Sequence, residues 1–440
     1  MLDPENLEKI RQQFDGSPYP RTPLEKSPKS DYNLLFLHDI TTPFYLRNQK
    51  VIDRRNKVIL DVGCGSGYKM LALAEANPEA KIVGIDLSAQ SIELAKKRLE
   101  FQGKGDRAEF FVMAIEDLPT LGMTFDYINC DDVLYLLDDL VSGLSSLKAV
   151  LNPQGLIRGN LHSSIQRVFF YRAQELFKMM GLMDENPGEL EVGIVRDLMK
   201  SLKDNVQLKS QTWKTKHEHN EEWFFMNYLF QRDKGFTIPE LFQALQGTDL
   251  EFVSMVNWRY WEPLDLFQDA DDLPAFLAMS LPELGIEDKL RFVELLHCPS
   301  RLLDFWCAHP DRKQPFVPIE EWTDAQWKSA KVHLHPQLRR EEVRTDLVRC
   351  IEEQRPFECS KYLNTQTRNT FFMESTLVSC LLPLWEGAQT VSHLAQRALK
   401  TRPIDPVNLE PTSENRAFEQ VKELLSSLEP FLYVLLENSA

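Results

Sequence analysis

The sequence has no apolar run long enough to cross a bilayer, which argues against an integral helical membrane protein. Its first residues lack the basic flank and apolar core of a signal peptide, and its seven cysteines form no Cys-X-X-Cys pair. An odd and sparse set of cysteines in a chain of 440 residues suits a reducing compartment. We therefore expect a cytoplasmic protein with no membrane segment.

The chain also lacks an excess of positive charge. It contains 66 Asp and Glu residues against 50 Lys and Arg, which gives a formal net charge of -16 at pH 7. Nucleic acids and anionic membranes are polyanions, so neither is expected as a constitutive partner. Hydrophobic residues make up 43% of the chain, as is usual for a globular protein, and its length suffices for two or three domains.

The clearest motif lies at residues 58–67, Val-Ile-Leu-Asp-Val-Gly-Cys-Gly-Ser-Gly. The apolar run that contains Asp61 predicts a buried parallel strand, and three glycines at alternate positions follow it. Glycine permits a tight turn and lets a ligand approach the backbone closely. A helical apolar pattern over residues 68–76 completes a strand, turn and helix cradle. Its Gly-X-Gly-X-Gly spacing differs from the Gly-X-Gly-X-X-Gly of nicotinamide enzymes.

A second buried strand is predicted over residues 81–86 and ends in Asp86, 25 positions after Asp61. A carboxylate at such a strand end can accept two hydrogen bonds from ribose hydroxyls. The alternative is that Asp86 caps the next helix. We favour the ribose contact, because the spacing from the glycine motif is that of one strand–helix unit.

Further strand patterns occur at residues 108–113, 125–130 and 156–162, with helix or turn signals between them. Asp131 and Asp132 follow the fourth strand, and as neighbours they point in different directions. At most one of them faces a pocket, and the alternative is a pair of acids stabilised at a helix N-terminus. Five strand–helix units in this order predict an α/β fold with a Rossmann-like sheet.

These motifs resemble those of class I S-adenosylmethionine (SAM) methyltransferases, closely over residues 51–162 and loosely over 237–258. The chain as a whole resembles uncharacterised cyanobacterial methyltransferases. The resemblance implies an enzyme in which an acceptor atom attacks the sulfonium methyl group of bound SAM. The cofactor contacts that it implies are Asp61, Gly63, Cys64, Gly65, Gly67, Asp86, Leu87, Ile115, Glu116 and Cys130.

Two departures from the family pattern bear on the cofactor and on the substrate. Ala114 stands where many relatives carry an acid that contacts the adenine amino group, so Glu116 or Asp117 would have to replace that side chain, while the Ile115 backbone remains available. The loop after the fourth strand is not Asn-Pro-Pro-Tyr, with which relatives grip planar amide or base nitrogens. That absence weakens the case for an adenine-N6 or glutamine methylase.

No conspicuous catalytic pair is required, since much of the rate enhancement is expected from proximity, orientation and exclusion of water. If a general base is needed, the candidates are Asp131, Tyr135 and His162 at the strand ends. For His162 the alternative is ordinary core packing. No metal site is predicted.

The rest of the chain is expected to be mainly helical, with a C-terminal portion that is similar to a winged helix. Its acidic third helix favours protein contact or a homodimer over DNA. In the N-terminal segment Tyr19, His38, Tyr45 and Arg47 are candidates for lid or substrate contacts. The predicted domains are an N-terminal lid segment at 1–50, the SAM-binding domain at 51–162, a helical insertion that acts as substrate lid at 163–236, a return to the SAM-binding domain at 237–270, and a helical region at 271–440 with the winged-helix-like part at 370–440.

We therefore expect an enzyme that moves a methyl group from SAM to an N or O acceptor. A protein side chain is favoured over a small metabolite, because the insertion and the C-terminal helices offer a large docking surface. Two alternatives stay open: a small-metabolite methyltransferase, and a SAM-binding regulatory or interaction protein that has lost methyl transfer.

Overall fold

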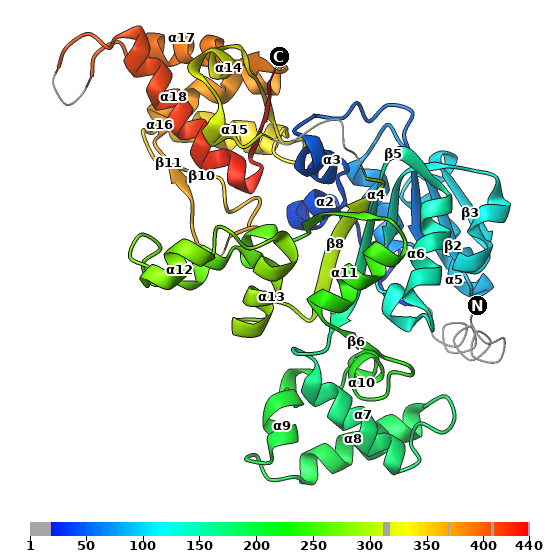
Figure 1. Ribbon diagram of the computed structural model, residues 1–440. Helices are drawn as coiled ribbons and strands as arrows, with labels where there is room; N and C mark the ends of the chain where they lie inside the picture. Colours follow the sequence, from blue (N-terminus) through cyan, green and yellow to red (C-terminus); the bar gives the residue numbers. More distant parts are fainter. Residues whose placement is uncertain (1–18, 311–316, 368, 406–408, 439–440) are drawn as a thin grey trace.

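A central eight-stranded sheet organises the protein (Figure 1). The computed structural model describes residues 19–310, 317–367, 369–405 and 409–438. The strand order is β3-β2-β1-β4-β5-β8-β7, with the short β6 beside β5. The strands are β1 (Val58–Val62), β2 (Lys81–Asp86), β3 (Ala108–Val112), β4 (Phe125–Cys130), β5 (Leu151–Ser163), β6 (Gly235–Phe236), β7 (Glu251–Met255) and β8 (Leu302–Ala308).

The first five strands and β6 run parallel, whereas β8 is antiparallel to both β5 and β7. The register places Asp61 of β1 between Gly84 of β2 and Asn129 of β4. Because the carboxyl ends of these parallel strands meet at one edge, the glycine motif and the acids that follow β2 and β4 come together. The predicted Rossmann-like α/β class is confirmed.

Helices cover both faces of the sheet, and each face has its own apolar core. One core contains residues of α4 (Tyr68–Ala76) and α5 (Ala89–Phe101), together with Ile40 and Phe44 near the N-terminus. The other contains residues of α6 (Leu140–Ala149) and α11 (Ile238–Gly247). The strands between them, buried on both sides, therefore read as nearly continuous apolar runs.

The insertion after β5 is a small helical lobe with a core of its own, which includes Phe177, Val195, Phe224 and Tyr228. In Figure 1 it lies on the opposite side of the sheet from the C-terminal helices. It consists of α7 (Val168–Met179), α8 (Glu189–Ser201), α9 (Gln207–Thr212) and α10 (Glu221–Asn227).

The expectation of an almost wholly helical chain after residue 271 is wrong at residues 302–308. This segment is β8, which joins β5 to β7 and completes the sheet, although α12 (Ala275–Ser280) and α13 (Ile286–Leu296) precede it. An apolar run of seven residues does not by itself distinguish a buried strand from a short buried helix. The predicted domain boundary at residue 270 therefore separates β8 from the rest of its sheet.

The C-terminal unit is built around a three-stranded sheet of order β12-β9-β13. Because β9 lies at Lys331–Leu334 and the same core holds Ile319 and Trp327, this unit begins well before residue 370. Its other elements are α14 (Asp324–Ser329), α15 (Glu341–Glu352), β10 (Phe357–Glu358), β11 (Phe372–Met373), α16 (Ser375–Val378), β12 (Gln389–Thr390), α17 (Val391–Thr401), α18 (Glu414–Leu428) and β13 (Val434–Glu437).

The N-terminal helices α2 (Tyr32–His38) and α3 (Thr41–Asn48) lie between the sheet and the C-terminal unit (Figure 1). The Tyr45 hydroxyl donates to Glu429, and the Arg47 guanidinium donates to the backbone carbonyl of His309. His38 is buried against Arg158 of β5. These three side chains hold units together, and of the four predicted lid residues only Tyr19 borders the glycine motif. No helix in the described part of the chain is both long and apolar enough to cross a membrane.

Candidate active site

The turn between β1 and α4 has the conformation that its three glycines make possible. Gly63, Gly65 and Gly67 all have positive φ angles, of 66°, 50° and 81°. A Cβ atom on Gly63 would lie 2.4 Å from a methyl carbon of Val133, and one on Gly65 would lie 2.2 Å from the carbonyl oxygen of Tyr19. The turn therefore requires glycine for its backbone angles and for its close contacts.

Asp86 fastens this turn to the end of β2. One carboxylate oxygen accepts the Gly65 N–H at 2.9 Å, and the other accepts the Ser88 N–H at 2.8 Å. The hydroxyl of Ser88 caps α5 by accepting the Ser91 N–H. The capping role considered for Asp86 thus belongs to Ser88.

A pocket of about 130 Å³ lies over the glycine turn. Eight of the predicted site residues line it: Gly63, Cys64, Gly65, Asp86, Leu87, Ile115, Glu116 and Asp131. Asp61, Gly67, Cys130, Tyr135 and His162 are outside its lining. Tyr19, Lys69 and Asp132 also line it, from the N-terminal segment, from α4 and from the loop after β4. The expectation that at most one of Asp131 and Asp132 faces the pocket is therefore wrong, because both line it and both contact Lys69.

The pocket suits a ligand that donates hydrogen bonds and carries positive charge. Within the described residues, the Oε2 atom of Glu116 is buried without a hydrogen-bond partner. Ala114, where relatives carry an acid, lines the same pocket. The adenine amino group, ribose hydroxyls and ammonium group of SAM are such donors, and the glycine turn leaves space that any side chain would fill. In the described residues no group of three or more His, Cys, Asp or Glu side chains is placed to hold a metal ion.

Lys69 and two acids form a buried ionic cluster beside the pocket. The Lys69 ammonium bonds Asp131 and also lies 2.9 Å from Asp132. Burial acts to raise the pKa of Asp131, but the charges of Lys69 and Arg158 outweigh it and hold this pKa below its usual value. Asp132 has a φ of 61°, in the left-handed region, and such backbone strain is concentrated at functional sites.

His162 belongs to a second buried cluster, at the junction of β5 with the insertion. Its Nδ1 lies 2.5 Å from Asp233, which also accepts a hydrogen bond from Arg167 at 2.6 Å. Its Nε2 lies 2.9 Å from a guanidinium nitrogen of Arg301. Burial lowers the pKa of His162, so the imidazole is neutral, with Nδ1–H donating to Asp233 and Nε2 accepting from Arg301.

Tyr135 connects the two clusters. Its ring stacks on that of His162 with centroids 3.8 Å apart, and its hydroxyl donates to Asp132 at 3.3 Å. Burial raises the pKa of Tyr135 well above its ordinary value, which keeps the phenol protonated. Arg301 completes the link, since its guanidinium lies 4.0 Å from Asp132.

Sequence reasoning missed Lys69, Asp233 and Arg301. Lys69 could have been found, because a side chain in the first turn after the glycine motif lies at the same sheet edge as the strand-end acids. Asp233 and Arg301 carry no local signal, since they reach His162 only through the packing of the insertion and of β8.

The chain is similar to known methyltransferases. Residues 53–234 match a family model described as a methyltransferase domain. An uncharacterised protein of Synechococcus sp. is 27% identical over 316 residues, which are 71% of this chain and 72% of that protein. A tRNA U34 carboxymethyltransferase of Campylobacter jejuni is 38% identical over 105 residues, but these are only 23% of this chain and 34% of the relative.

Among solved structures, PKMT2 from Rickettsia typhi superimposes with a TM-score of 0.59 at 17% sequence identity, over 92% of this chain and 76% of that one. Its complex with AdoHcy gives a TM-score of 0.58 at 18% identity, over 93% and 76% of the two chains. At this level of identity the likeness concerns the fold, which extends through the C-terminal unit.

The sheet order and the glycine turn agree with the class I methyltransferase fold. Residues 53–234 match a methyltransferase domain, which supports a SAM-dependent methyltransferase with S-adenosylmethionine as its cofactor.

Proposed function

We propose that the protein transfers the methyl group of SAM to a nitrogen or oxygen atom of a protein side chain. The observation that carries the proposal is the set of polar groups at one end of the pocket, Tyr19, Lys69 and Asp132, which we name the acceptor end. Burial and the nearby Asp132 raise the pKa of Tyr19, while Lys69 and Arg301 act to lower it. Closely spaced groups of both charges suit a slender polar side chain better than a bulky apolar metabolite.

SAM supplies an electrophilic methyl group when it is bound, so the protein has to present a nucleophile with a free electron pair in line with it. Asp132 is held by Lys69 and Tyr135, and its carboxylate can accept a hydrogen bond from an acceptor N–H or O–H. The Tyr19 hydroxyl, which lines the same pocket, can orient the same group. These contacts would position the acceptor and exclude water.

The three predicted base candidates differ in chemistry. The lowered pKa of Asp131 suits electrostatic attraction of a cation more than proton removal, and the protonated phenol of Tyr135 suits hydrogen bonding. His162 is the neutral base among them, but its Nε2 faces Arg301. We propose that His162 positions Arg301 beside Asp132 and receives a proton only if Arg301 moves away.

RNA is the second candidate acceptor class, because the Campylobacter jejuni relative bears the name of a tRNA-modifying enzyme. That match covers about a quarter of this chain, and the formal charge of -16 opposes RNA binding. We therefore place RNA below a protein substrate.

The test is transfer of labelled methyl from SAM into a lysate of the source organism, fractionated into protein, RNA and small molecules. Asp86→Asn should abolish labelling, because it weakens the anchor of the glycine turn, whereas Asp204→Asn on the insertion surface should not. Label in the protein fraction supports the proposal. Label confined to RNA or to small molecules contradicts it, and SAM binding without any transfer favours a regulatory protein.

A further inference from the structure

A second and larger cavity, of about 600 Å³, lies at the opposite edge of the sheet from the cofactor site. Its walls come from β7, from the segment that follows it, and from α12 and α13. It has no lining residue in common with the cofactor pocket. β7 is five strand intervals from β2, or roughly 24 Å at the usual spacing. The methyl-transfer chemistry thus leaves this cavity unused.

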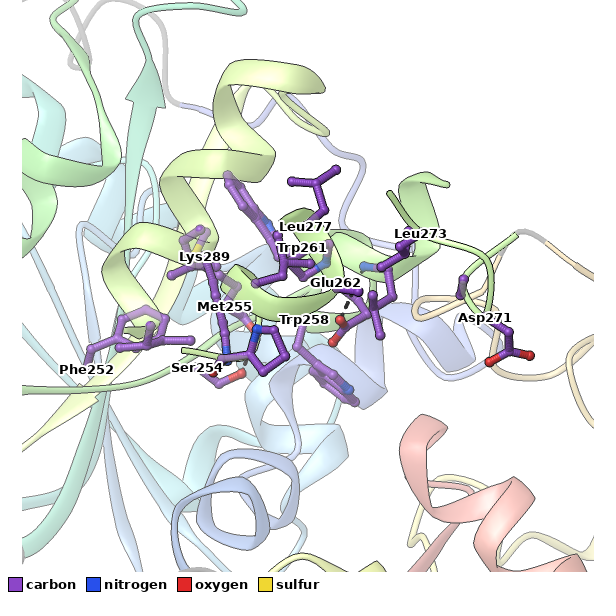
Figure 2. A pocket seen from close by; sticks show the side chains of 18 of the residues that line it. Phe252, Ser254, Met255, Trp258, Trp261, Glu262, Asp271, Leu273, Leu277 and Lys289 are labelled. Atoms are coloured by element: carbon purple, nitrogen blue, oxygen red, sulfur yellow. Dashed lines mark hydrogen bonds between the residues drawn. The ribbon is translucent and has the colours of Figure 1, made fainter. Parts of the chain in front are cut away.

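The lining of this cavity is mainly apolar, and it includes three aromatic side chains. Figure 2 shows Phe252, Met255, Trp258 and Trp261 grouped around it, with Asp271 at its edge. The indole N–H of Trp258 donates to the Pro430 carbonyl at 3.1 Å. The indole N–H of Trp261 likewise donates to Asn257, at 3.1 Å. With their polar edges satisfied inside the protein, the rings offer apolar surface to a ligand.

The rim of the cavity carries large apolar side chains that face solvent. Phe276 is 75% exposed, Met279 70%, Ile286 54% and Leu264 40%. Leu264 and Ile286 also line the cavity, so that its apolar surface continues outward. Large exposed apolar side chains on the elements that form a cavity indicate an interaction site in soluble proteins.

The charge around this surface is mainly negative, although Lys289 also lines the cavity. Residues 262–288 contain eight Asp and Glu residues and no Lys or Arg. Two of them, Glu262 and Asp271, line the cavity. The next residue, Lys289, donates from its ammonium to the Pro282 carbonyl at 3.3 Å. An anionic ligand or membrane surface would be repelled here, whereas an apolar segment with lysine or arginine beside it would be attracted.

We propose that this cavity and its rim bind a basic amphipathic segment of another protein, with its apolar side chains in the cavity and its cationic groups against the acidic rim. A helix that presents apolar residues on one face and lysine or arginine on the other has the required chemistry. The proposal goes beyond methyl transfer and does not depend on it, because binding can be measured without SAM.

The test is fluorescence anisotropy with the full chain and three labelled peptides of about 14 residues, each roughly 21 Å long as a helix. The first combines leucine with lysine in a helical repeat, the second has glutamate in place of lysine, and the third has serine in place of leucine. We expect saturable binding of the first, with the other two at least about tenfold weaker because each lacks one half of the complementarity.

Variants on the cavity locate the binding site. Ala278→Trp, which fills the cavity from an exposed position, and the surface pair Phe276→Ser with Met279→Ser should each weaken the leucine–lysine peptide by about tenfold. The matched control is Leu190→Ser, since Leu190 is 72% exposed on the insertion and far from the cavity. The surface pair keeps the test valid if Ala278→Trp does not fold.

Four outcomes would overturn the proposal. The glutamate peptide could bind as tightly as the lysine peptide, or the serine peptide could bind as tightly as the leucine peptide. The leucine–lysine peptide could fail to bind, or it could bind the cavity variants as tightly as the wild-type protein. None of these results depends on whether the protein transfers methyl groups.

Discussion

Replacement of Gly65 by alanine should loosen the cofactor turn and weaken SAM binding. An L-residue at its φ of 50° costs about 1–2 kcal/mol. The new Cβ would lie 2.2 Å from the Tyr19 carbonyl oxygen, whereas real Cβ contacts below 3.0 Å essentially do not occur, so the turn or the N-terminal segment has to move. Two hydrogen bonds hold that segment to Ser66. The Ser66 N–H donates to the Tyr19 carbonyl at 2.8 Å, and the Ser66 hydroxyl donates to the Pro20 carbonyl at 2.7 Å. Loss of both adds about 1–3 kcal/mol.

The total expected cost is therefore about 2–5 kcal/mol. The chain offers matched controls for the cost of the backbone angle alone. Gly103 and Gly122 each have a φ of 67°, and a Cβ on either would meet nothing within 4 Å. Calorimetric titration should show SAM binding at least about tenfold weaker for Gly65→Ala, and near wild type for Gly103→Ala and Gly122→Ala. Thermal unfolding should place Gly65→Ala below both controls. If Gly65→Ala equals the controls in SAM affinity and in melting temperature, the close contact with Tyr19 is refuted.

Three further predictions concern the charged groups. Lys69→Met removes the cation that the buried Asp131 shares with the partly exposed Asp132. It should lower the free energy of unfolding by several kcal/mol and abolish methyl transfer, whereas Lys96→Met at an exposed ion pair should cost under about 1 kcal/mol. Burial lowers the pKa of His335 to about 4, so the imidazole takes up a proton in the unfolded chain at a higher pH than in the folded protein. The free energy of unfolding should therefore fall as the pH drops from 6.5 toward 4. In urea unfolding, His335→Gln should show a pH slope that is shallower by up to about 1.4 kcal/mol per pH unit. Asp233→Asn should misalign His162 and so slow methyl transfer, as measured by initial rates. The affinity for SAM, measured by titration, should stay within about twofold of the wild-type value.

The cofactor half of the site was predictable from sequence because its signals are local. β1, its glycine turn and α4 follow one another within 20 residues, and the turn has the positive φ angles that its glycines allow. The acid at the end of β2 was predictable for the same reason, since one strand–helix unit fixes its distance from Gly67. Eight of the thirteen predicted site residues line the pocket, and all of them lie at or after the carboxyl ends of β1 to β4.

The partners of His162 could not be predicted, because distant parts of the chain supply them. Asp233 lies 71 positions after His162, and Arg301 lies 139 positions after it, yet both contact the same imidazole. Their arrangement depends on the packing of the helical lobe and on the pairing of β8 with β5. Neither leaves a periodic pattern next to His162. β8 was predicted as helical for the same reason, since its strand partners β5 and β7 are distant in the sequence.

The late strand β8 also sets the electrostatics of the cofactor site. Arg158 of β5 is buried, and Asp304 of β8 receives two hydrogen bonds from it, at 3.0 and 2.7 Å. The same guanidinium lies 3.9 Å from Asp131, at the end of β4. A chain cut after residue 270 would keep the glycine turn but leave Arg158 without Asp304, its nearer partner, and removal of one partner from a buried ion pair is strongly destabilising. The segment matched by the methyltransferase family model ends at residue 234, so the working unit has to include residues about 70 positions beyond it.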